Sequence, residues 1–227
     1  MSRGVFITGT DTGVGKTLAA CALLHALASR GIRAAPMKPI AAGVVERSGR
    51  LANEDSLALL EASGRDASWL EVVTPILLRE PMAPHIAAAR EGRTLSFAPI
   101  MTAFERLQAS SEFLVVEGVG GFRVPLDERS DTVDLARAFG LPVVMVVGLR
   151  LGCLNHALLT AQAIEAAGLG FAGWIANRID PAMAAPDENV AALQARLRAP
   201  LLGRFPHSSA PDAQRLAAHI DVAALLG

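Results

Sequence analysis

The chain has 227 residues, of which 52% are hydrophobic and 19% charged, and its formal net charge is −1 at pH 7. This length suits one α/β domain with a sizeable core, and we expect a single P-loop-type domain over residues 1–227. The near-neutral charge and the lack of tyrosine argue against a nucleic-acid-binding surface.

The sequence also offers little for a membrane. Its longest apolar stretch, residues 141–149, falls well short of the roughly 20 residues that span a bilayer. The chain opens into an apolar run without the pattern of a signal peptide. Cys21 and Cys153 lie far apart in apolar, helix-like segments, which is typical of reduced, packed thiols. We therefore expect a cytoplasmic protein that binds no membrane.

Apolar runs alternate with helical periodicity along the chain. In chain order the patterns predict a strand at residues 4–8, a helix at 17–30, a strand at 33–38, helices at 53–63 and 97–110, strands at 113–117 and 142–147, a helix at 155–167, a strand at 171–176, a helix at 189–198, a short strand at 201–203 and a helix at 211–226. Residues 180–187, with a proline near each end, predict a flexible loop. Strands without period-two alternation, separated by helices, indicate a doubly wound α/β fold whose mostly parallel sheet has helices on both faces.

Residues 9–17, GTDTGVGKT, lie between the first predicted strand and the first predicted helix, the context that a phosphate loop requires. Backbone N–H groups there can cradle phosphate oxygens, while Lys16 reaches the terminal phosphates and the Thr17 hydroxyl holds magnesium. Five residues separate the first and last glycines instead of the usual four, so the loop is a variant of the motif. Its nucleotide-binding candidates are Gly13, Val14, Gly15, Lys16 and Thr17.

The chain has nineteen arginines and two lysines, and both lysines occupy places suited to phosphate chemistry. Lys16 closes the phosphate loop, and Lys38 ends the predicted strand at residues 33–38. An ammonium is a compact point charge, whereas a guanidinium is a wide fork. ATP carries about four negative charges, which Lys16, Lys38 and one magnesium ion would offset. Because Lys38 exceeds what nucleotide binding alone requires, it suggests an anionic phosphoryl acceptor.

Polar residues end several of the predicted strands, and parallel strands bring such ends to one edge of the sheet. Lys38, Glu117 and Asn177 occupy these positions. Glu117 ends an apolar strand, where a magnesium ligand is expected. Asp55 opens a predicted helix, so it is either a first-turn acid that favours the helix dipole or a further metal ligand. Thr17, Asp55, Glu117 and two phosphate oxygens would nearly fill the shell of magnesium.

Five segments together resemble one known family. They are GTDTGVGKT, MKPIAAG, VVEGVGG, VVGLRLGCLNHALLTAQAI and GWIANRI. Their order and spacing over residues 5–206 strongly resemble dethiobiotin synthetase of biotin biosynthesis. The resemblance implies an ATP- and magnesium-dependent ligase that makes the ureido ring of dethiobiotin from 7,8-diaminononanoate and carbon dioxide. The reaction would pass through a carbamate and a carbamic–phosphoric anhydride.

The resemblance also implies roles for individual residues. Thr12, Lys16 and Lys38 would contact the carbamate and the phosphate. Asn177 would recognise adenine, and Pro206 would flank the base. Thr17, Asp55 and Glu117 would hold the metal.

A homodimer is implied as well, with the substrate carboxylate received by Gly152, Cys153 and Asn155 of the neighbouring subunit. A helix start offers free N–H groups to an anion, although Asn155 could equally be a plain helix cap. His85 is more typical of a structural residue than of a catalytic one. Arg123 either is solvated or shapes the mouth of the site.

Two other functions remain open on sequence alone. A nucleotide-switched ATPase of the plasmid-partition or division-site type shares the fold and a variant loop. Such proteins typically carry an extra lysine near the start of the loop, where this chain has Thr10 and Asp11. An amidase-type domain of corrin biosynthesis is also close in fold, but it would need a glutamine amidotransferase partner.

Overall fold

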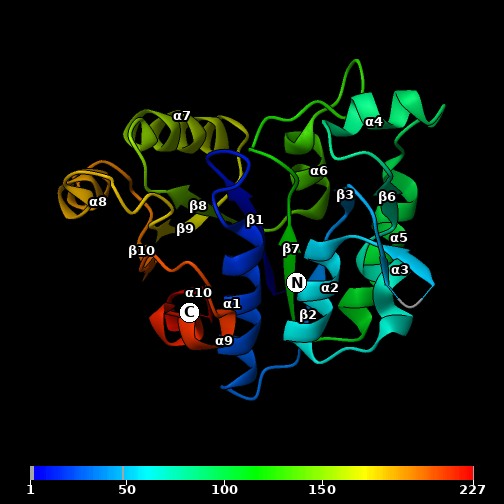
Figure 1. The fold of residues 1–227 in the computed structure, drawn as a ribbon, viewed down its shortest axis with the longest axis horizontal. Helices are drawn as coiled ribbons and strands as arrows, with labels where there is room; N and C mark the ends of the chain where they lie inside the picture. Colours follow the sequence, from blue (N-terminus) through cyan, green and yellow to red (C-terminus); the bar gives the residue numbers. More distant parts are fainter. Residues whose placement is uncertain (1–2, 48, 227) are drawn as a thin grey trace.

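The computed structural model describes residues 3–47 and 49–226. At its centre is a six-stranded parallel sheet with the order β10-β9-β8-β1-β7-β2 (Figure 1). The strands are β1 (Gly4–Gly9), β2 (Ala34–Met37), β7 (Phe113–Glu117), β8 (Val143–Gly148), β9 (Phe171–Asn177) and β10 (Leu201–Phe205). The predicted parallel sheet is therefore confirmed, and all six of its predicted strands are present.

Side chains of the sheet point alternately into two hydrophobic cores. In β1, Phe6 joins one core while Val5 and Ile7 join the other. The core that contains Val5 is covered by α1 (Lys16–Ala28), α2 (Glu54–Ser63) and α9 (Ala213–Leu216). The core that contains Phe6 is covered by α5 (Phe97–Ala109), α6 (Thr132–Phe139), α7 (Cys153–Ala166) and α8 (Pro186–Gln194). Burial on both faces explains why the strands are continuous apolar runs, and it confirms the doubly wound class.

Short elements that sequence patterns did not predict fill the connection between β2 and β7. They are the parallel pair β3 (Ile40–Ala42) and β6 (Ile76–Leu78), the hairpin β4 (Val45–Arg47) with β5 (Arg50–Ala52), the turns η1 (Ala67–Trp69) and α3 (Leu70–Val73), and α4 (Pro84–Arg90). All of these elements except α4 have three or four residues, which is too short to display a period. This connection places residues 81–84 beside the carboxyl end of the sheet.

Two predicted helices are corrected by the structure. The helix predicted at residues 189–198 is α8, which begins at Pro186, because proline is favoured in the first helical turn. The loop predicted at residues 180–187 is thereby shortened. The single helix predicted at residues 211–226 is three pieces: α9, η2 (Ala217–His219) and α10 (Ala223–Leu226). The helix breaks at Ile220, because the backbone of Ile220 forms an antiparallel bridge with Gly203 in β10.

Among the described residues, no helix is both long and apolar enough to cross a membrane. A single domain over residues 1–227 stays a prediction, since positions 1, 2, 48 and 227 lie outside the described residues.

Gly203 makes the attachment of the C-terminal segment testable. A Cβ built there would lie 2.5 Å from the His219 carbonyl oxygen. We expect Gly203→Ala to loosen residues 217–226 and to lower the free energy of unfolding by about 1–3 kcal/mol. Hydrogen exchange would report faster exchange in that segment. Gly170→Ala is the control, because its Cβ would meet the Pro142 Cβ at an ordinary 3.5 Å; equal effects of the two variants would contradict the prediction.

Candidate functional site

The predicted phosphate loop joins β1 to α1 at the centre of the sheet, at the upper end of α1 in Figure 1. Gly13 and Gly15 have φ angles of 74° and 90°, a region that favours glycine. Lys16 Nζ donates to the Asp11 carbonyl oxygen at 3.0 Å and so spans the loop from the inside. The loop is therefore shaped by its own lysine and by two left-handed glycines.

Asn177 supports the loop from below. It is buried at the end of β9, and its Nδ2 donates to the Val14 carbonyl oxygen at 2.9 Å. A Cβ added at Gly15 would overlap this amide group. The side chain of Asn177 thus fixes the backbone of the loop, while its predicted contact with adenine stays a prediction.

A buried cluster of one ammonium and two carboxylates lies next to the loop. Lys38 follows β2, and its Nζ is 2.6 Å from Glu117 Oε1 and 2.9 Å from Asp55 Oδ2. Thr17 Oγ1 donates to the same Glu117 oxygen at 2.9 Å. The sequence predicted that Lys38, Glu117 and the phosphate loop would meet at one edge, and the structure brings Lys38 and Thr17 within hydrogen-bond distance of Glu117.

Helix α2 supplies Asp55 to this cluster. Asn53 is the helix cap, and its side chain accepts the Asp55 N–H at 3.0 Å. Asp55 is consequently a first-turn acid and also a partner of Lys38. Of the two interpretations that the sequence left open, the structure confirms the first-turn acid, and the metal ligand stays a prediction.

Burial and charge set the protonation of the cluster. Burial opposes the charge of Lys38, but Glu117 and Asp55 outweigh it and raise the pKa of this lysine. Burial likewise opposes the charge of Asp55, yet the ammonium of Lys38 holds the pKa of Asp55 below its usual value. For Lys16, burial dominates and lowers the pKa to about 8 although Glu117 acts in the opposite direction. At neutral pH Lys38 in the cluster and Lys16 in the loop therefore both carry a positive charge.

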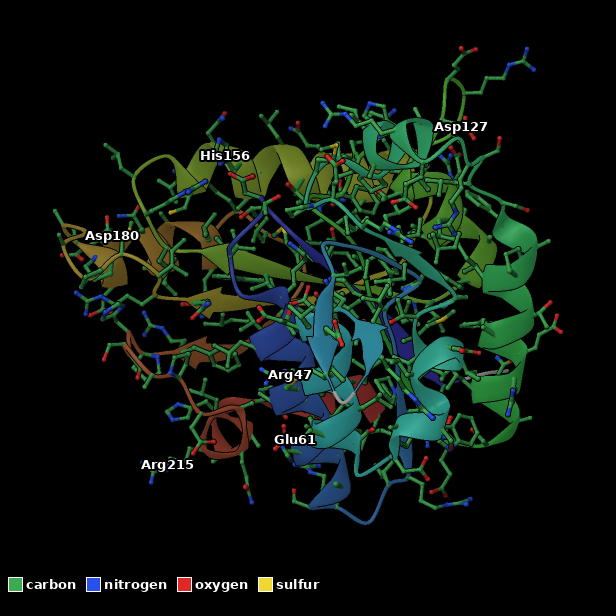
Figure 2. The ribbon with its side chains drawn as sticks, turned by 45° about the vertical axis from the view of Figure 1, so that its right-hand side comes forward. Arg47, Glu61, Asp127, His156, Asp180 and Arg215 are labelled. Atoms are coloured by element: carbon green, nitrogen blue, oxygen red, sulfur yellow. The ribbon has the colours of Figure 1, made fainter. Side chains whose placement is uncertain are left out.

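A cleft of about 910 Å³ opens above the loop and the cluster. Its walls include residues 81–84, which lead into the first turn of α4. They also include five residues that follow β7, namely Val119, Gly120, Gly121, Arg123 and Val124. Figure 2 shows Asp127 and His156 at this upper end of the molecule, far from Arg215 at the opposite end. The predicted site residues that line the cleft are Thr12, Gly13, Gly15, Lys16, Thr17, Lys38, Asp55 and Glu117.

Other predicted residues do not line this cleft. Val14 is buried beneath the loop. Pro206 is exposed and borders a separate hollow of about 290 Å³ that is also lined by Arg178 and Arg204. A larger hollow, of about 1220 Å³, lies between α2, α3 and α5 and contains none of the predicted site residues. Its lining contains neither a lysine nor the phosphate loop, so the smaller cleft is the candidate site.

The predicted carboxylate-binding segment forms the start of α7, outside the cleft. Gly152, with φ 93°, is the helix cap, and Asn155 lies exposed in the first turn. The interpretation of Asn155 as a helix cap is therefore wrong, because Gly152, which directly precedes the helix, takes that position. Cys153 buries its side chain, and its backbone N–H donates to the Arg150 carbonyl oxygen at 3.0 Å.

Asp11 and Arg150 belong to the site although the sequence analysis gave them no role. Arg150, in the turn between β8 and α7, forms an ion pair with the Asp11 carboxylate. The same carboxylate accepts the Thr12 N–H at 2.7 Å. The sequence carried a weak signal for Asp11, which lies inside the loop, and none for Arg150.

Two residues left open by the sequence also find partners. Arg123 lines the cleft and pairs with Asp131 at 2.6 Å. His85 Nδ1 lies 3.1 Å from the Pro125 carbonyl oxygen, so it joins α4 to the segment that follows β7. This contact agrees with a structural histidine.

Thr17, Asp55 and Glu117 are the residues that the sequence predicted as metal ligands. The described residues contain no group of three or more His, Cys, Asp or Glu that could hold a metal ion. However, Glu117 Oε2 is buried without a hydrogen-bond partner, which is costly for a carboxylate oxygen. Together with Asp55 and the Thr17 hydroxyl it offers hard oxygens. These residues fit a magnesium ion whose remaining ligands are phosphate oxygens and water.

Comparison with known proteins gives one family match and two kinds of relative. Residues 3–215 match a family model described as an AAA domain. Over 218 residues the chain is 55% identical to the ATP-dependent dethiobiotin synthetase BioD of Aromatoleum aromaticum, covering 96% of each chain. The ParA family ATPase from Chlorobium tepidum TLS matches with a TM-score of 0.56 at 16% identity, over 98% of this chain and 92% of that one. The MinD cell division protein of Aquifex aeolicus gives 0.55 and 16%, over 95% and 94%. The two structural matches indicate a shared fold alone.

Gly15 and Gly13 provide a matched test of the loop. Both have positive φ, so alanine costs strain of about 1–2 kcal/mol at either position. A Cβ would overlap Asn177 at Gly15, but it would meet nothing within 4 Å at Gly13. We expect Gly15→Ala to weaken ATP binding at least about tenfold more than Gly13→Ala, measured by calorimetry. Equal losses would show that the contact with Asn177 does not matter.

The lowered pKa of Lys16 predicts a pH dependence. Its ammonium is present below about pH 8 and is lost above it in the ligand-free protein. Because phosphate binding needs the charged form, ATP affinity should fall as the pH rises through this value, with the fall shifted upward by the bound phosphate. Calorimetry at stepped pH measures the effect. Lys16→Arg keeps its charge throughout and should remove the dependence; a flat profile for the wild type would contradict it.

Proposed function

The chain belongs to the family of ATP-dependent dethiobiotin synthetases, and we propose that it closes the ureido ring of dethiobiotin from 7,8-diaminononanoate, carbon dioxide and ATP. The structural observation that carries this proposal is the pair of lysines in one cleft. Lys16 belongs to the phosphate loop, and Lys38 lies beside it in a buried cluster. A second ammonium at this point suits an acceptor that is itself an anion.

The nucleotide occupies the loop. Its β- and γ-phosphates would lie against the backbone N–H groups of residues 13–17 and the start of α1, where free N–H groups favour anions. Lys16 would leave the Asp11 carbonyl to reach the terminal phosphates. The adenine would lie toward Asn177 and Pro206, at the ends of β9 and β10.

Magnesium would be held by Thr17, Asp55 and Glu117. Supporting this, Glu117 Oε2 has no partner within the described part of the chain. When bound, the ion supplies positive charge that offsets the charge on the β- and γ-phosphates. Thr17, Asp55 and Glu117 would determine where this positive charge lies relative to the phosphates.

The reaction steps are those that the resemblance to dethiobiotin synthetases implies. One substrate amine adds to carbon dioxide and loses a proton, giving a carbamate. A carbamate oxygen attacks the γ-phosphorus and ADP leaves, so that a carbamic–phosphoric anhydride forms. The second amine then attacks the carbamate carbon and expels phosphate as the ring closes. Lys38 and Thr12 would orient the carbamate, while Lys16 stabilises the transferring phosphoryl group.

Lys38→Met tests this division of labour. We expect near-normal ATP affinity but a loss in kcat that corresponds to about 3 kcal/mol of transition-state stabilisation or more. Lys16→Met should weaken ATP binding as well, because its ammonium contacts the nucleotide. Calorimetry and steady-state kinetics measure the two quantities. Near-normal turnover of Lys38→Met would refute the role of the second lysine.

We also propose a homodimer in which Gly152, Cys153 and Asn155 of one subunit receive the substrate carboxylate of the other. Its support is apolar surface on the same segment, where Leu151 is 95% exposed and Leu159 is 56% exposed. Leu151→Glu should raise the dimer dissociation constant at least about tenfold by placing a charge in the interface. Sedimentation measures it, with Leu51→Glu as the control on the remote β5. Unchanged association would contradict the interface.

The decisive assay for the function is phosphate release from MgATP with and without 7,8-diaminononanoate plus bicarbonate, with product identified by mass. Release that needs both co-substrates and yields dethiobiotin supports the proposal. Release indifferent to the diamine would overturn it and would favour a switch ATPase.

A further inference from the structure

Lys38 contacts the two carboxylates that are proposed to hold magnesium. Its Nζ contacts Glu117 Oε1 at 2.6 Å, Asp55 Oδ2 at 2.9 Å and the Gly118 carbonyl oxygen at 3.3 Å. The lysine side chain is 5% exposed and that of Glu117 is 1% exposed. Without a metal, the ammonium is thus the cation that compensates both carboxylates.

A divalent ion and this ammonium are poor neighbours. Magnesium binds oxygen at about 2.0–2.1 Å and demands near-octahedral geometry. An ammonium that keeps its short contacts with the same two carboxylates would lie within a few ångströms of the ion, where burial strengthens their repulsion. Thr17 Oγ1 donates its hydrogen to Glu117 Oε1, so its lone pairs stay free to face a metal. Repulsion between the two cations therefore displaces the ammonium, and not the oxygen ligands, once a metal binds.

The side chain of Lys38 has somewhere to go. Its backbone N–H is fixed to the Val73 carbonyl oxygen at 2.8 Å, so the strand end stays in place. The lysine itself lines the cleft of about 910 Å³ that also contains Lys16 and Thr12. Four flexible carbons let the ammonium swing from the carboxylates into this cleft without moving the backbone.

We propose that Lys38 has two positions: it neutralises Asp55 and Glu117 in the metal-free protein, and binding of the metal with the nucleotide releases its ammonium toward the acceptor. This inference rests on the proposed function for the identity of the acceptor. The carboxylates thereby act twice, first as holders of the lysine and then as metal ligands. The second cation reaches the cleft when the nucleotide and its metal are in place, so loading precedes activation of the acceptor.

The composition of the chain provides a direct test, because Lys16 and Lys38 are its two lysines. Protein labelled with ¹³C at lysine Cε gives one signal for each, and Lys16→Met assigns them. With β,γ-imido-ATP and EDTA, we expect the Lys16 signal to shift while the Lys38 signal stays. Adding magnesium chloride should then shift the Lys38 signal. A Lys38 signal that ignores magnesium, or that moves fully with the analogue alone, would overturn the proposal.

Metal affinity gives a second, independent readout. Binding of Mn²⁺ alone, followed by electron paramagnetic resonance, should be at least about tenfold tighter in Lys38→Met than in Lys16→Met. Lys16 is the matched control, since it carries the same charge in the same cleft but donates to a carbonyl oxygen instead of the carboxylates. Equal tightening in the two variants would mean a general charge effect and no direct competition. If Lys38→Met does not fold, the labelled wild type still decides.

Neither readout needs the diamine or turnover, so failure here is separable from failure of the proposed function. Metal-dependent movement of Lys38 without dethiobiotin formation would support the two positions of Lys38 and overturn the proposed acceptor. Dethiobiotin formation with an immobile Lys38 would support the proposed function and overturn the two positions.

Discussion

A buried ion pair joins the ends of two neighbouring strands, and the site is built around it. β2 and β7 run parallel with Met37 opposite Val116, so the next residues, Lys38 and Glu117, emerge side by side. Removing two charges from water is expensive, and it is tolerated when the pair is close and its other atoms find partners. Here the ammonium is shared with Asp55, whereas one oxygen of Glu117 has no partner in the described residues. The pair is therefore incomplete by itself, as expected of a cluster that binds a ligand.

The sheet topology places the phosphate loop against this pair. β1 lies between β7 and β8, and the chain leaves its carboxyl end to form the loop and α1. Where the connections that leave two adjacent parallel strands turn to opposite sides of the sheet, a crevice forms at the carboxyl ends of those strands. Polar ends of β7 and β9 reach the loop from either side: Glu117 accepts from Thr17, and Asn177 donates to Val14. One crevice thus gathers groups from residues that are 100 and 163 positions apart in the chain.

Lys16 and Lys38 differ in how readily each ammonium group can leave its hydrogen-bond partners. Burial leaves Lys16 with a pKa of about 8, whereas the carboxylates raise the pKa of Lys38. Lys16 donates to a carbonyl oxygen that a phosphate can replace without leaving a buried charge unpaired. Lys38 cannot leave Asp55 and Glu117 unless another cation replaces it. The difference between the two lysines therefore comes from their partners and not from their chemistry.

The sequence by itself determined the parallel sheet, the phosphate loop and the gathering of Lys38, Glu117 and Asn177 at the edge that carries the loop. For Asp55 it left two alternatives, a first-turn acid and a metal ligand. Strands buried on both faces must be apolar throughout, and polar residues at their carboxyl ends must share one edge, so local patterns carry this information. Segments of three or four residues, such as β3 and α3, escaped it because they are too short for a period.

Tertiary structure decided the contacts that depend on distant parts of the chain. The break at Ile220 arises because its backbone bridges to Gly203, and the sequence of residues 211–226 does not predict that contact. Likewise, Arg150 joins Asp11 across 139 positions because β8 lies next to β1 in the sheet. Residue type and spacing specify which groups end at the edge of the sheet. Which oxygen each ammonium holds there is set by the packing of the strands that carry them.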